Sequence, residues 1–80
     1  MTDFTDHAQR YLILVEGGPP SNYSAWAPDL PGCVATGDDI DQCATNMREA
    51  IAFHLEGLAA AGEPAPEPSC GAGVYVAHAA

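Results

Sequence analysis

The segment at residues 23–37 constrains the fold of this chain more than any other part of the sequence. Residues 23–27 alternate with the period of two that is typical of a β-strand whose faces meet different surroundings. Residues 28–32, Pro-Asp-Leu-Pro-Gly, stop this strand, because each proline fixes its own φ and pushes the preceding residue into an extended conformation. The apolar run at 33–36 resumes a strand, and Gly37 ends it. The segment therefore predicts a β-hairpin with a stiff five-residue loop.

A long helix is predicted immediately after the hairpin. Asp39 is the expected N-cap, with Gln42 three residues later in the manner of a capping box, and Asp38 is the competing cap. Asp41 lies in the first turn, where a negative charge favours the helix dipole. Gly62 suits the position just after the helix end. The residues that recur at helical spacing and form one apolar stripe are Ile40, Cys43, Ala44, Met47, Ala50, Ile51, Leu55 and Leu58.

The rest of the sequence predicts two further strands and a connection. Residues 11–15 are apolar on both faces, which indicates a central strand, and 73–77 form a short last strand. Alternate prolines at 63–68 predict an extended strap, and residues 1–6 are expected to be a frayed terminus. The predicted fold is α+β: an antiparallel β-β-β-α-β sheet with one long helix on one face.

Size, charge and cysteine content restrict the possible functions. Eighty residues predict one domain, 1–80, with a marginal core, so self-association into a dimer or tetramer is expected. The formal charge of −9 argues strongly against direct binding to nucleic acid, disfavours anionic membranes and favours a basic protein partner; general solubility is the alternative explanation. Three cysteines without a signal peptide, and no apolar stretch of about 20 residues, predict a reducing, cytoplasmic location.

Three segments of the sequence together resemble the HicB antitoxin family. The hairpin loop carries Tyr-x-Ala-x-x-Pro-Asp-Leu-Pro-Gly-Cys from Tyr23 to Cys33, followed by Gly37 and Asp38. The helix matches the family pattern at Asn46, Glu49, Ala50, His54 and Leu55. Residues 62–68, Gly-Glu-Pro-Ala-Pro-Glu-Pro, match the family's proline strap, so the similarity covers residues 9–77.

The resemblance implies a partial ribonuclease-H-like fold and an antitoxin function. Family members bind and block HicA, a small basic RNA-cleaving toxin with a catalytic histidine. Many of them carry a second, DNA-binding domain, which this sequence does not continue into, so operator binding by the chain alone is not expected. No enzyme activity, cofactor or metal is predicted. The alternative is an orphan HicB-like module that binds a ligand or regulates another protein without a toxin partner.

The acidic trio Asp38, Asp39 and Asp41 is the first candidate binding site. Helix capping explains it structurally, and contact with a basic toxin explains it functionally; a capping carboxylate still projects a negative field. A two-metal nuclease site would need carboxylates converging from the central strands, and residues 11–15 and 33–36 contain none. His54 is expected to pack on the sheet as a structural residue.

Trp26, Asp29 and Leu30 are the other candidate partner-binding residues. Trp26 belongs either to the core, which is favoured because the chain has few large side chains, or to the open face of the sheet as an anchor. Asp29 and Leu30 lie in the proline-stiffened loop. That loop is either purely structural or a preorganised contact, since its rigidity lowers the cost of ordering it on binding.

Overall fold

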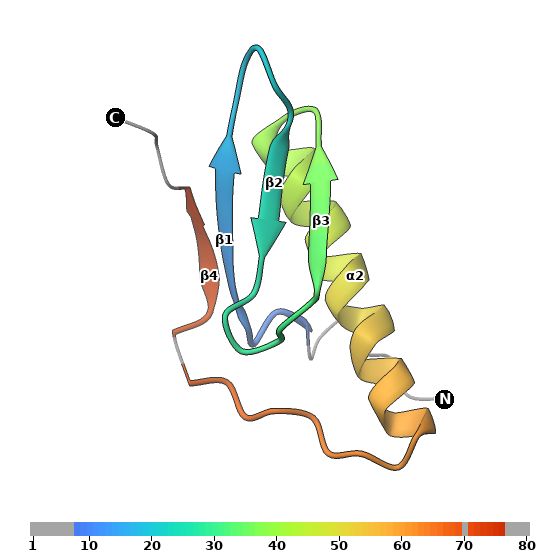
Figure 1. The fold of residues 1–80 in the computed structure, drawn as a ribbon. Coiled ribbons are helices and arrows are strands. Elements are labelled where there is room, and N and C mark those ends of the chain that lie inside the picture. Colours follow the sequence, from blue (N-terminus) through green and yellow to red (C-terminus); the bar gives the residue numbers. More distant parts are fainter. Residues whose placement is uncertain (1–7, 70, 77–80) are drawn as a thin grey trace.

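The chain forms a four-stranded sheet with a long helix on one face, as the computed structural model shows for residues 8–69 and 71–76 (Figure 1). The elements in chain order are β1 (Leu12–Gly17), β2 (Tyr23–Trp26), β3 (Val34–Gly37), α2 (Ile40–Ala60) and β4 (Gly73–Val76). The predicted α+β class and element order are confirmed. The expectation for residues 1–6 and the inclusion of Ala77 in the last strand fall outside the described residues.

The order of strands across the sheet is β3-β2-β1-β4. The first three strands form the predicted antiparallel meander, and β1 is the predicted central strand. β4 differs from the prediction of a wholly antiparallel sheet, because it pairs with β1 in parallel. The reason is the connection. After β3 the chain runs along α2 and returns beneath the sheet, so that β4 enters from the same end as β1 (Figure 1). Parallel neighbours require a long crossover of this kind.

The core lies between the sheet and α2. Ile13 and Val15 on β1 and Ala25 on β2 are buried against the helix stripe, in which Met47 and Ile51 are fully buried. α2 lies mainly over β3 and β2. The predicted stripe therefore faces the sheet, and among the described residues no helix covers the opposite face. No helix in the described part of the chain combines the length and the apolarity that crossing a membrane requires.

Both ends of α2 are capped by the residues that the sequence indicates. The Asp39 carboxylate accepts a hydrogen bond from the Gln42 N–H at 2.7 Å, so Asp39 rather than Asp38 is the N-cap. The Gln42 side chain accepts the Asp38 N–H at 2.6 Å. Gly62 follows the C-cap with φ +75°, and the Gly62 and Glu63 N–H groups bond back to the carbonyls of Ala59 and Leu58. These two bonds are the Schellman motif, which satisfies the last carbonyls of the helix.

The proline-rich strap, residues 63–69, is attached to the body of the molecule at two points. The buried Tyr11 hydroxyl donates a hydrogen bond to the Pro66 carbonyl at 2.5 Å. The Asp29 carboxylate accepts hydrogen bonds from the Ser69 N–H, at 2.9 Å, and from the Ser69 hydroxyl. The two attachments fix the path along which the chain passes from α2 to β4.

Candidate protein-interaction face

The face of the sheet turned away from α2 carries a continuous row of large apolar side chains. The strand register places Val34 of β3 opposite Trp26 of β2, Trp26 opposite Leu14 of β1, and Leu14 opposite Tyr75 of β4. Paired residues in neighbouring strands point to the same side of a sheet. With strands about 4.8 Å apart, the row spans roughly 14 Å across the molecule. We call these four residues, together with Leu12 one pleat along β1, the apolar row.

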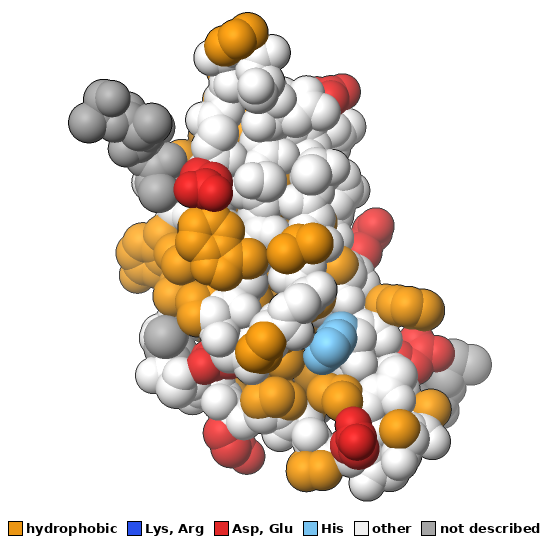
Figure 2. Space-filling view, in the orientation of Figure 1, with side chains coloured by type: hydrophobic (Ala, Val, Ile, Leu, Met, Phe, Trp, Pro, Cys, Tyr) orange, Lys and Arg blue, Asp and Glu red, His pale blue; other side chains and the backbone are white. Residues whose placement is uncertain are grey.

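The apolar row is accessible at both of its ends. Val34 is 67% exposed and Tyr75 is 59% exposed, whereas Leu14 and Trp26 between them are half-buried. Figure 2 shows apolar side chains gathered over the strands on this side of the molecule. Scattered exposed apolar residues are normal on protein surfaces, but a contiguous patch marks an interaction site.

Negative charge lies at one end of the same face. The next row along the strands contains Glu16, Ser24 and Thr36. At the same end of the sheet, the connection after β3 carries the exposed residues Asp38 and Asp39, and the first turn of α2 carries the exposed Asp41. Among the described residues visible in Figure 2, acidic side chains occur around the apolar patch and no Lys or Arg is seen. The face therefore combines an apolar row with an acidic end.

Trp26 lies on this open face and not in the core, so the favoured alternative from the sequence was wrong. It is half-buried between Leu14 and Val34 and does not belong to the core cluster. The core position on β2 is taken by Ala25, whose small side chain leaves room for the helix. The physical reason is the alternation of the strand: once Ala25 faces α2, Trp26 must face away.

The predicted loop residues Asp29 and Leu30 have structural roles. The Leu30 side chain is buried in the core with 1% exposure, so a partner would not reach it in the folded chain, and its expected contact role is corrected. Its burial follows from the tight turn, in which the Leu30 N–H bonds to the Ala27 carbonyl and the Cys33 N–H to the Leu30 carbonyl. Asp29 is half-buried and holds the strap through Ser69.

The acidic trio lies together at the N-terminus of α2. Asp39 is the cap, Asp41 is in the first turn, and Asp38 precedes them, all three being exposed. The capping explanation is confirmed for Asp39. A partner contact by the same carboxylates stays a prediction. Within the described residues, no group of three or more His, Cys, Asp or Glu side chains is placed to hold a metal ion.

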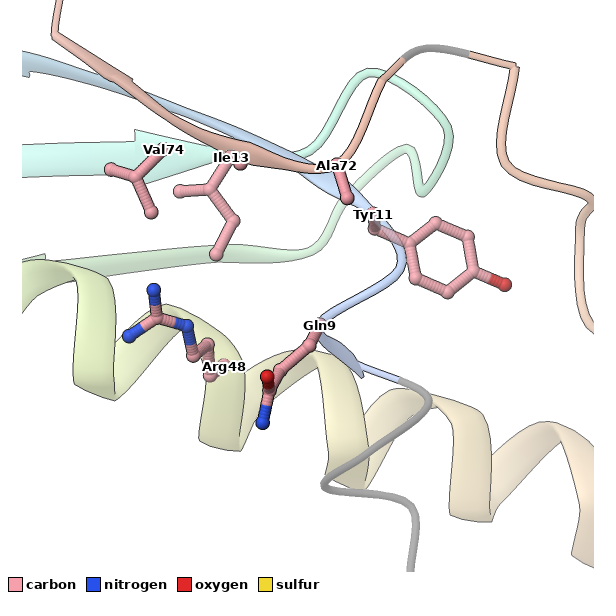
Figure 3. A pocket seen from close by; sticks show the side chains of 7 residues that line it. Gln9, Tyr11, Ile13, Arg48, Ala72 and Val74 are labelled. Atoms are coloured by element: carbon pink, nitrogen blue, oxygen red, sulfur yellow. The ribbon is translucent and has the colours of Figure 1, made fainter.

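Three hollows lie on the described surface; two are away from the apolar row, and the third borders it at Val34. A cavity of about 240 Å³ lies beside the starts of β1 and β4 and is lined in part by Arg48 of α2, Gln9, Ile13 and Val74 (Figure 3). A second, of about 170 Å³, lies under the strap beside Tyr11. An open groove of about 410 Å³ separates the start of β3 from α2 and is lined in part by Phe53 and His54. His54 is half-buried there, and its packing on the sheet stays a prediction.

Two thiols are part of the packed interior. Cys33 and Cys43 are free and buried, and burial raises the pKa of each thiol above its ordinary value because it disfavours the thiolate. A thiol with a raised pKa is a weak nucleophile. Both cysteines therefore act as small apolar core residues.

Sequence analysis did not identify Leu14, Val34 and Tyr75 as site residues. The signal for Leu14 was present, because residues 11–15 are apolar on both faces and a helix covers only one of them. Val34 and Tyr75 carried no local signal. They join Trp26 only through the strand register, and β4 pairs with a strand about 60 residues earlier in the chain, which no local pattern specifies.

Comparison with known proteins identifies the family. Residues 11–77 match the model of the HicB-like antitoxin of bacterial toxin–antitoxin systems. The UPF0150 protein ssr1765 of Synechocystis is 33% identical over 67 residues, covering 84% of this chain and 85% of that protein. An uncharacterized 14.9 kDa protein of Haemophilus phage HP1 is 40% identical over 45 residues, covering 56% of this chain.

A solved structure shows the same fold. The crystal structure of the Burkholderia pseudomallei antitoxin HicB superposes with a TM-score of 0.61 at 40% sequence identity, over 65% of this chain. The chain spans 39% of that antitoxin and 34% of the phage protein. Since the family match includes the hairpin, α2, the strap and β4, the chain belongs to the HicB-like antitoxin family.

Proposed function

We propose that this chain is the antitoxin of a type II toxin–antitoxin system, and that it binds a small basic RNA-cleaving toxin of the HicA type and blocks it by occlusion. The observation that carries the proposal is the family match over residues 11–77. The charge of −9 supports it, because an acidic protein attracts a basic partner and speeds their encounter. Occlusion would place the antitoxin over the RNA-binding face and catalytic histidine of the toxin.

The proposed action is stoichiometric binding, without catalysis and without direct contact to nucleic acid. The strand cores carry no carboxylate at which metal-dependent hydrolysis could be centred. We further propose that the chain acts in the cytoplasm and self-associates as a dimer or tetramer. The outer edges of β3 and β4, which end the sheet in the described part of the chain, would supply the contact.

The test is co-expression with the small basic protein encoded beside the gene of this chain. Expression of the basic protein alone is expected to arrest growth. Co-expression of this chain is expected to restore growth and to give a complex of fixed stoichiometry on copurification. Growth arrest that persists although this chain is well expressed and folded would contradict the antitoxin function.

A second function, ligand binding by an orphan family member, is favoured by the cavity beside Arg48. Arg48 is half-buried at the cavity wall, and none of the described residues that line the cavity is acidic, so a small carboxylate or phosphate would find a cation there (Figure 3). Thermal unfolding with acetate, succinate or inorganic phosphate tests this. A midpoint raised in the original chain but not in Arg48→Gln would support ligand binding, and no shift with any anion would contradict it.

A further inference from the structure

We infer that the open face of the sheet, with the apolar row at its centre, is the surface on which the basic protein partner docks. The inference rests on the proposed function and deepens it by naming the surface and the chemistry of the partner. The partner surface that fits is an apolar strip with Lys or Arg side chains at one end. α2 also carries exposed carboxylates, but Phe53 is its one large exposed apolar side chain, whereas the open face carries a row of large apolar side chains.

The apolar row has the composition of an interface centre. Trp26 and Tyr75 lie on either side of Leu14 in the same row, and aromatic residues dominate binding energy at protein interfaces. Trp26 is already held between Leu14 and Val34, so little side-chain freedom would be lost on binding. The 59% exposure of Tyr75 and the 67% exposure of Val34 leave large apolar surfaces for a partner to cover.

Charge selects a basic partner over a second copy of this chain. Glu16 lies on the open face, one row from Leu14, and Asp38, Asp39 and Asp41 lie at the same end of the sheet. Two copies packed through this face would bring together two surfaces of the same negative sign, which repel each other at low salt. A partner with basic side chains at that end would gain from the same charges.

Two side chains of the hairpin loop are used within the fold. Leu30 fills the core and Asp29 holds the strap. Both arginines lie elsewhere: Arg48 at the cavity beside β4 and Arg10 beside the strap. The open face therefore carries no described cation that would repel a basic partner.

The experiment measures the Kd between this chain and an inactive variant of the small basic protein encoded beside its gene. The method is isothermal titration calorimetry. Tyr75→Glu on the open face is compared with Phe53→Glu on α2. The two variants are matched: each replaces an exposed aromatic residue, at 59% and 78% exposure, and each adds one negative charge. Val34→Glu provides a second change on the open face.

The expected result is a large difference within the matched pair. Tyr75→Glu and Val34→Glu should raise the Kd by about 30-fold or more, the loss typical of an interface hot spot. Phe53→Glu should leave the Kd within about threefold, as expected for a surface charge outside the contact. Far-UV circular dichroism checks folding; if Tyr75→Glu does not fold, the uncharged pair Tyr75→Ser and Phe53→Ser replaces it.

The outcomes separate the inference from the function on which it rests. If the unmodified chain does not bind the basic protein, the proposed function fails. If it binds, and Tyr75→Glu and Val34→Glu bind as tightly as Phe53→Glu, the function stands and the docking surface is wrong. If Phe53→Glu loses affinity, with or without Val34→Glu, while Tyr75→Glu keeps it, the groove between β3 and α2, which both Phe53 and Val34 line, is the surface instead. If the open-face variants change the oligomeric mass of this chain in the absence of the partner, but not the Kd for the partner, the open face serves self-association and the inference is overturned.

Discussion

At Gly37 the end of β3 lies so close to the first turn of α2 that there is no room for a side chain. A Cβ atom at this position would lie 2.4 Å from the backbone nitrogen of Cys43 and 2.6 Å from its Cα, both shorter than a real contact. These are backbone atoms, so neither can move aside without shifting the first turn of α2. The glycine in the family pattern is therefore needed here for close packing.

Gly37→Ala is predicted to destabilise the fold by about 1–3 kcal/mol, the usual cost of overpacking a dense site. Gly57→Ala is the matched control. Gly57 lies within α2, and a Cβ there would meet nothing within 4 Å, so alanine should stabilise the helix by up to about 1 kcal/mol. Urea denaturation of the two variants measures both effects. A Gly37→Ala variant as stable as the original chain would contradict the close approach.

At the scale of elements, the acidic start of α2 combines two roles that a charge-matched pair of variants separates. Asp39→Ala removes the side chain that accepts the Gln42 N–H, and the loss of an N-cap costs about 1 kcal/mol. Asp38→Ala removes the same charge and keeps both the cap and the Asp38 N–H that bonds to Gln42. Thermal denaturation should therefore show a lower midpoint for Asp39→Ala only. An equal decrease of the midpoint in the two variants would mean that the negative charge, and not the capping hydrogen bond, stabilises the helix.

The strap depends on a tyrosine whose ionisation weakens its attachment. Burial raises the pKa of Tyr11 above its ordinary value of 10.0, because it disfavours the phenolate, and the neutral hydroxyl donates to the Pro66 carbonyl. A group whose pKa is higher in the folded state stabilises the fold fully below its unfolded pKa. That contribution decreases as the pH rises from the unfolded pKa through the folded one.

Tyr11→Phe is predicted to lower the free energy of unfolding by about 0.5–1.5 kcal/mol at neutral pH, the value of one hydrogen bond. The difference from the original chain should stay constant up to about pH 9 and decrease above about pH 10, where the unfolded tyrosine ionises first. Both chains keep Cys33 and Cys43, so the titration of these thiols cancels in the comparison. Urea denaturation at several pH values measures it, and a difference independent of pH would refute this role for Tyr11.

At the scale of the whole molecule, local sequence patterns predicted the helix and the strands. They did not predict the direction of β4 or the face on which Trp26 lies, because both depend on contacts between distant parts of the chain. The strand alternation, the apolar stripe, Asp39 and Gly62 specify β1 to β3 and α2, because each acts within a few residues. The parallel direction of β4 depends on the path of the strap, which is set by the Asp29–Ser69 attachment across 40 positions of the sequence. Trp26 was assigned to the wrong side because alternation fixes which residues share a face but not which face receives the helix.

The candidate site was predictable only in part for the same reason. The acidic residues at the start of α2 and Trp26 were identified from the sequence. Leu14, Val34 and Tyr75 become neighbours of Trp26 only when four strands are in register. At this scale the molecule is a small acidic scaffold. One face of the sheet forms the core with α2, and the other is the face on which we propose that the partner docks.

Trp26 offers the most direct measurement of that account, because it is the only tryptophan in the chain and lies in the apolar row. The chain is titrated with the inactive basic protein, whose own tryptophans are replaced by phenylalanine, while Trp26 fluorescence and its quenching by acrylamide are recorded. Docking on the open face predicts a shift of the emission to shorter wavelength and a fall of the quenching constant to roughly half or less, since the centre of an interface excludes water. A complex that forms by calorimetry while Trp26 emission and quenching stay unchanged would contradict the account.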